Sequence, residues 1–128
     1  MNRLRRRLAS SEGFTLIELL VVIVIIGILL AIAIPSYLGF RKQAQDTAGA
    51  ANVREAVPSA ESYFATNSTY VGMTQPVLKT IDSGLSPSVS VSNVSATGYC
   101  LSAPGQAGAT WYYAGPGGSV TSAKPTGC

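Results

Sequence analysis

One apolar run near the amino terminus dominates this sequence. From Phe14 to Ile34 it reads FTLIELLVVIVIIGILLAIAI, and only Thr15 and Glu18 in it are polar. As an α-helix the run is about 30 Å long, which is the thickness of the hydrocarbon core of a bilayer. Because it is apolar on every side, it does not have the polar face of a helix that lies on a soluble core. The run therefore predicts a helix that crosses a membrane.

The charge of the chain lies in front of this run. The net charge is +3, and it is carried entirely by residues 1–13, where four arginines face one glutamate. Basic residues beside a membrane helix stay on the cytoplasmic side, so the chain after the run is expected outside. The later charges balance, so the basic isoelectric point does not indicate binding to nucleic acid.

Two common kinds of segment share these features. One is a secretory signal peptide, with Ala31-Ile32-Ala33 as its cleavage site, and the other is a plain single-pass anchor. Neither explains Glu18, because a carboxylate within such a run costs several kcal/mol unless it is neutralised or paired. Glu18 could reach the membrane interface instead, but its side chain is short for that.

The two cysteines lie in the part of the chain that is expected to be exported. An even number of cysteines there suggests one disulfide, Cys100–Cys128. Closing that loop is worth about 3–4 kcal/mol. Two free thiols, or one thiol bound to another chain, are the alternatives.

A family resemblance starts at the beginning of the apolar run. The segment GFTLIEL, from Gly13 to Leu19, resembles the prepilin peptidase site of type IV pilins and of type II secretion pseudopilins. The segment GILLAIAIP, from Gly27 to Pro35, continues the resemblance, which extends from Ser11 to about Ala65.

The resemblance implies a processing step and an assembly step. A prepilin peptidase would cut between Gly13 and Phe14 on the cytoplasmic side and methylate the new amine of Phe14. The helix would be retained, and the amine would pair with Glu18 of its own chain or of a neighbour. That pairing would fix the register of a head-to-tail contact that generates a helical filament. The implied partners are the prepilin peptidase/N-methyltransferase, other pilin subunits, the inner-membrane assembly machinery and, before assembly, membrane lipid.

Gly27 and Pro35 are the two helix-weakening residues of the anchor. Pro35 removes a backbone hydrogen bond and is expected to kink the helix. In similar filaments the stretch between such a glycine and proline unwinds on packing. The same is expected here for Gly27 to Pro35.

The sequence of the part that is expected to be exported predicts a helix followed by a small sheet. Residues 36–65 have good helix formers, with weak points at Gly49 and Pro58. An apolar stripe recurs at helical spacing and is expected to pack on the sheet; it consists of Val53, Val57, Ala60 and Phe64.

Residues 67–87 read as a loop, and alternating or aromatic segments after them read as strands. The strands are expected at Val89 to Val91, Tyr99 to Ala103 and Thr110 to Ala114, with residues 120–123 as a fourth strand or an irregular tail. The aromatic segment at 111–113 could bind a surface or a sugar, but alternate rings facing the core is the simpler interpretation.

The expected fold class is α+β, with a long, kinked amino-terminal helix packed on an antiparallel sheet of three or four strands. Four segments are expected: a cleaved leader at 1–13, a membrane and filament-core helix at 14–35, an amphipathic helix at 36–65 and a disulfide-bonded sheet domain at 66–128.

Among the function classes, an enzyme is not expected. The chain has no histidine, a single acidic residue beyond position 61 and no metal-ligand spacing, so neither a catalytic site nor a metal or cofactor is predicted. The leading hypothesis is a type IV pilus subunit, anchored in the inner membrane and then exposed at the cell surface. The alternatives are a pseudopilin of a type II secretion system and a membrane-anchored binding module that does not assemble.

Overall fold

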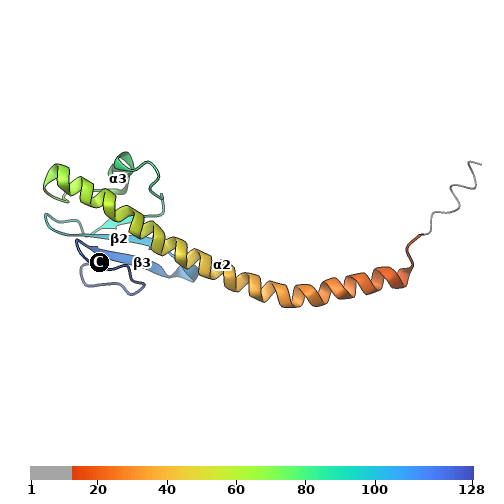
Figure 1. Cartoon of the computed structure of the whole chain (residues 1–128). Helices are drawn as coiled ribbons and strands as arrows, with labels where there is room; N and C mark the ends of the chain where they lie inside the picture. The colour runs from red at the N-terminus through yellow and green to blue at the C-terminus, as the bar shows by residue number, and fades with distance from the viewer. Residues whose placement is uncertain (1–12) are drawn as a thin grey trace, which may run out of the picture. The chain divides into compact units, whose positions relative to one another are not determined.

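The computed structural model describes residues 13–128. The chain divides into two compact units, Met1–Leu38 and Gly39–Cys128. Helix α2 (Leu16–Asn67) contributes to both and is 52 residues long. Figure 1 shows this helix together with the small sheet of the second unit. The long helix and the three-stranded antiparallel sheet confirm the predicted α+β fold.

The described part of the first unit is mostly helix, and none of its side chains is buried. Every residue from 13 to 38 is exposed, although most of them are Leu, Ile or Val. A patch of this size is far above what an isolated soluble chain exposes. The apolar segment of α2 therefore requires lipid or other protein to cover it.

Helix α2 continues through both of its prolines. Pro35 and Pro58 each remove one backbone hydrogen bond, yet the helix assignment is unbroken. The helix ends at Asn67 because Ser68 adopts a positive φ of 58° and its N–H donates to the Phe64 carbonyl at 2.7 Å. The boundary expected at 35/36 is thus not a break between helices, and the kink expected at Pro35 stays a prediction.

In the second unit α2 packs one stripe on the sheet, as the sequence predicts. Val53 and Ala60 of the predicted stripe are fully buried, and Val57 and Phe64 are partly buried against the same core. At Gly49 the helix comes very close to the sheet, since a Cβ atom there would lie 2.7 Å from the Pro104 carbonyl oxygen. The weak point Gly49 is therefore a requirement of packing.

The connection between helix and sheet contains a helix that the sequence analysis missed. Residues 67–87 were expected as a loop, but α3 (Gln75–Ile81) lies within them. Thr74 caps it, since its Oγ1 accepts from the Val77 N–H at 3.4 Å, and Pro76 occupies the first turn. Leu78 anchors the helix in the core, where it is fully buried. Seven residues are too few to show a helical period, so only the cap and the proline could have indicated α3.

The sheet has the strand order β1-β2-β3, and both pairs are antiparallel. The strands are β1 (Ser90–Ser92), β2 (Tyr99–Pro104) and β3 (Thr110–Gly115), and a 3₁₀ helix, η1 (Gln106–Gly108), lies in the β2–β3 turn. The tail forms a single bridge, Thr121 to Tyr112, instead of a fourth strand.

The aromatic segment of β3 splits between the two faces of the sheet. Tyr113 is buried and Trp111 packs against the core, whereas Tyr112 pairs with the carboxy-terminal tail through Thr121. Alternate rings thus face the core, as the simpler interpretation predicts.

The disulfide predicted from the cysteine count is present between Cys100 of β2 and Cys128, with 5.3 Å between the two Cα atoms. Asn93 adds to this attachment, because its Nδ2 donates to the backbone oxygens of Gly127 at 3.1 Å and Cys128 at 2.9 Å. The tail after β3 is therefore held to the sheet at its last residue.

A partly buried polar group joins α2 to the rest of the core. The Glu61 carboxylate of α2 accepts from the Tyr99 hydroxyl at 2.7 Å and from the Tyr70 hydroxyl at 3.0 Å. Burial, together with this carboxylate, raises the pKa of Tyr70 to about 12 and raises that of Tyr99 further. Both phenols therefore stay neutral donors over the physiological range.

We predict that Glu61→Ala lowers the free energy of unfolding by about 2–4 kcal/mol, because two buried hydroxyls lose their acceptor. Denaturant unfolding of the full chain in detergent measures this change. Glu55→Ala is the matched control, since Glu55 lies on the same helix but is exposed, and it should change stability by less than about 0.5 kcal/mol. Equal small effects of both variants would contradict the role of Glu61.

Candidate functional site

The residues expected to be processed lie in front of α2 and are open to approach. The leader residues 1–12 lie outside the described residues. Gly13 has no atom within 4 Å of the position where a Cβ would stand, and Phe14 is 83% exposed. The peptide bond between them therefore precedes the helix and is not covered by the rest of the chain that the structure describes.

The first turn of α2 is closed by Thr15 and Glu18. The Thr15 N–H and Oγ1–H donate to Glu18 Oε2 at 2.8 and 2.9 Å, and the Glu18 N–H donates to Thr15 Oγ1 at 3.2 Å. This reciprocal arrangement is a capping box, in which two backbone N–H groups at the helix start find side-chain acceptors. The sequence analysis singled out Glu18 but not Thr15, although the spacing Thr-x-x-Glu is the signature of such a box.

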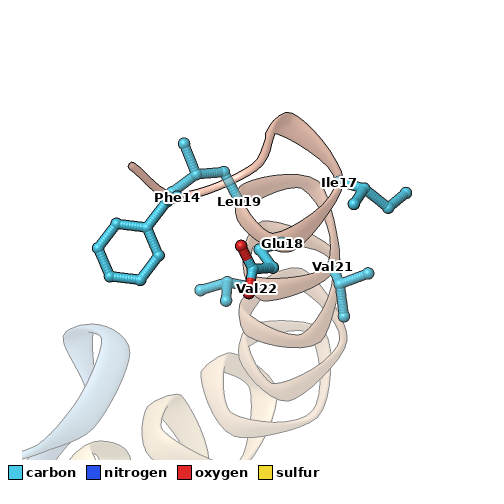
Figure 2. A pocket seen from close by; sticks show the side chains of 6 residues that line it. All are labelled: Phe14, Ile17, Glu18, Leu19, Val21 and Val22. Atoms are coloured by element: carbon cyan, nitrogen blue, oxygen red, sulfur yellow. The ribbon is translucent and has the colours of Figure 1, made fainter. Parts of the chain in front are cut away.

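Phe14 and Leu19 occupy the positions of a hydrophobic staple, before the cap and one residue after Glu18. Both line a shallow hollow on the helix surface, together with Ile17, Glu18, Val21 and Val22. Figure 2 shows the Phe14 ring standing away from the helix, on the side opposite to Ile17 and Val21. The Glu18 carboxylate thus lies in a mostly apolar surface, and the Phe14 ring at the edge of this surface stands away from the helix.

The capping box lowers the free-energy cost of placing the Glu18 carboxylate in an apolar surrounding. Oε2 receives two hydrogen bonds, and the positive end of the helix dipole favours a carboxylate in the first turn. Among residues 13–128, Oε1 has no hydrogen-bond partner. The chain thus satisfies one carboxylate oxygen by itself and leaves the other available to a cation.

Gly27 and Pro35 both lie within the exposed helix. No atom lies within 4 Å of a Cβ built on Gly27, so nothing in the single chain requires a glycine there. Small residues in apolar helices let neighbouring helices approach closely. The described part of the chain therefore gives no packing reason for a glycine at this position.

Two further observations concern membrane crossing and metal binding. Within the described residues α2 is long and apolar enough to cross a membrane. Over the same residues there is no group of three His, Cys, Asp or Glu side chains that could hold a metal ion.

Comparison with known proteins agrees with the position of this site. The prokaryotic N-terminal methylation motif matches residues 8–34, which include Gly13, Phe14 and Glu18. Over 129 aligned residues the chain is 37% identical to the type IV wide pilus major component PilA4 of Thermus thermophilus, covering 93% of this chain and 98% of that protein. The chain belongs to the type IV pilin family.

Shorter matches to other pilins support the same assignment. The type IV narrow pilus major component PilA5 of Thermus thermophilus is 44% identical over 43% of this chain and 59% of its own length. The type IV major pilin protein PilA of Myxococcus xanthus is 37% identical over 53% of this chain and 31% of its own length. The predicted family is confirmed, and these relatives give the pseudopilin alternative no advantage.

Proposed function

We propose that this type IV pilin is a structural subunit of a surface filament, made as a membrane-anchored precursor and assembled after cleavage and N-methylation. One observation carries the proposal: an apolar helix exposed on every side begins with a single carboxylate that has one free oxygen. Lipid can cover the helix before assembly, and copies of the same helix can cover it afterwards. Neither role requires a catalytic group.

Processing supplies the cation that the carboxylate lacks. Cleavage between Gly13 and Phe14 removes the arginine-rich leader and leaves an amine next to the cap residue Thr15. In an apolar surrounding this amine is attracted to the free oxygen of Glu18 on a neighbouring copy. One such pair for each subunit fixes the axial register of helices that otherwise offer similar apolar surfaces to each other.

The proposal assigns a task to each segment. Residues 1–13 are the leader, 14–35 are the membrane anchor and later the filament core, and 36–65 carry the sheet domain of residues 66–128. Before assembly the chain crosses the inner membrane once, with its carboxy-terminal part outside. Its partners are then lipid, the prepilin peptidase with its methyltransferase activity, the assembly machinery and other pilin subunits.

Mass spectrometry of the mature protein tests the processing step. The chain purified from cells is expected to begin at Phe14 and to carry one methyl group on its amino terminus. A chain that begins after Ala33, as a secretory signal would leave it, or that still begins at Met1, contradicts the proposal.

Substitution of Glu18 tests the pairing. Glu18→Gln keeps an oxygen that can accept from the Thr15 N–H, so the helix cap survives while the charge is lost. We predict normal membrane insertion and cleavage but a loss of filaments of at least about tenfold, because the neighbour's amine loses its counter-ion. Sheared filaments are counted by electron microscopy and quantified by immunoblot.

Thr15→Ala is the matched control for the cap. It removes the hydroxyl of the capping box but keeps the Glu18 charge, and it should leave filament yield within about threefold of the unmodified chain. Normal filaments from Glu18→Gln would overturn the pairing. An equal loss from Thr15→Ala would assign the effect to the cap instead.

The proposal extends to the stretch from Gly27 to Pro35. Pro35 already lacks one helical hydrogen bond, and Gly27 is the residue of lowest helix propensity between Phe14 and Ile34. We expect this stretch to lose its helical hydrogen bonds when the subunit packs into a filament. A filament reconstruction with helical density throughout the stretch would show that it does not.

A further inference from the structure

The second unit begins with a short aromatic and basic stretch of α2. Gly39 directly follows the exposed apolar unit in the chain, and the next three residues are Phe40, Arg41 and Lys42. All three side chains are exposed, and Phe40 is 69% exposed, although phenylalanine is usually buried in a soluble domain. The stretch therefore offers an aromatic ring and two cations to the surroundings of the helix.

The two cations have no partner within the part of the chain that the structure describes. No hydrogen bond or ion pair there includes the Arg41 guanidinium or the Lys42 ammonium. The first acidic residue after them is Asp46, whose Oδ1 accepts from the Gln106 N–H at 2.7 Å. This bond holds the carboxylate against the β2–β3 turn, where a Cβ on Gly105 would lie 2.9 Å from Asp46 Oδ1. Both positive charges are therefore available to a partner outside the chain.

The directions of these side chains favour a partner that surrounds the helix. Successive residues of an α-helix are rotated by about 100°, so Phe40, Arg41 and Lys42 point to three different sides of α2. A protein that packs on one side of the helix would meet only part of this set. The surface of a bilayer encloses a helix that leaves it, so lipid headgroups meet the side chains on every side.

The order of the residues matches the layers of a membrane surface. After the apolar run the chain has two aromatic residues, Tyr37 and Phe40, and then the two cations. Aromatic rings are enriched at the boundary between hydrocarbon and water, and lysine and arginine extend their charged ends beyond it. The anionic groups at that level of a bilayer are the phosphates of the lipid headgroups.

We propose that Arg41 and Lys42 bind phosphate groups of phospholipids in the outer leaflet of the inner membrane before the subunit is assembled. The inference rests on the proposed function, because it requires a precursor that crosses this membrane with its sheet domain outside. Attraction between such cations and a lipid surface is electrostatic and is weakened by salt. The pair holds the start of the second unit at the membrane surface, and these contacts are lost when the subunit leaves the bilayer.

Solid-state NMR of the full chain in vesicles tests the lysine contact. The chain has three lysines, Lys42, Lys79 and Lys124. Their side chains are labelled with ¹⁵N, and the chain is reconstituted into vesicles of equal parts phosphatidylethanolamine and phosphatidylglycerol. Dephasing of an ammonium ¹⁵N signal by lipid ³¹P reports a contact between the two groups. We expect one of the three ammonium groups to be dephased, and Lys42→Gln to remove that signal.

The other two lysines provide matched controls. Lys79 and Lys124 are both exposed, so Lys79→Gln and Lys124→Gln should leave the dephased signal unchanged. Absence of ³¹P dephasing in the unmodified chain, or dephasing that survives Lys42→Gln, would overturn the lipid contact.

A gain of signal tests the arginine. Arg41→Lys adds a fourth lysine and should double the dephased ammonium signal. Arg54→Lys is the control, because Arg54 is exposed on the same helix but lies beyond Gly49, where α2 comes close to the sheet. It should add no dephased signal. If Arg41→Lys adds none either, the assignment of Arg41 to the lipid surface is wrong.

Failure of this inference is distinguishable from failure of the proposed function. Extraction of the same vesicles with alkaline carbonate shows whether the chain is anchored in the bilayer. A chain that resists extraction but has no phosphate contact leaves the proposed function intact and makes the lipid contact wrong. A chain that carbonate extracts is not anchored in the membrane, and both proposals then fail.

Discussion

The need to cover an apolar helix governs the rest of this molecule. The stretch from Phe14 to Ile34 is apolar and exposed on all sides. Two surroundings can cover it, a bilayer and a bundle of identical helices. Both are apolar, so moving from one to the other changes the hydrophobic free energy little, and polar contacts must decide when and how the subunit leaves the membrane.

Glu18 is the polar contact that the structure places at the start of this helix. Considered by sequence alone, its carboxylate has no partner in the apolar run. The structure reduces that cost, because Thr15 donates two hydrogen bonds to one of its oxygens. The capping box lowers the cost of holding the Glu18 carboxylate in a membrane. The second carboxylate oxygen, Oε1, can still bind a cation. A residue that was fully satisfied within its own chain could not select a partner.

Much of the fold follows from local patterns in the sequence. The length of the apolar run, the stripe at Val53 and Ala60, the aromatic strand at 110–114 and the cysteine pair each predict an element or bond that the structure contains. Helix α3 was missed because its evidence is one cap residue and one proline within a stretch rich in glycine and proline. The close approaches at Gly49 and Gly105, and the link from Glu61 to Tyr70 and Tyr99, depend on segments far apart in the sequence, which no local pattern contains. At the candidate site the roles of Gly13, Phe14 and Glu18 stay predictions. Thr15 was missed, although its spacing to Glu18 is a sequence signature of the capping box that the hydrogen bonds of the first turn show.

The central claim is that the Phe14 amine of one subunit touches Glu18 of another, and solid-state NMR of filaments measures this contact most directly. Filaments grown from a mixture of ¹⁵N-phenylalanine subunits and subunits with ¹³C-labelled glutamate carboxyl groups report only contacts between copies. The account predicts dipolar coupling between the terminal amine nitrogen and a glutamate carboxyl carbon, corresponding to a separation of about 4 Å. Intact mixed filaments without that coupling would contradict it.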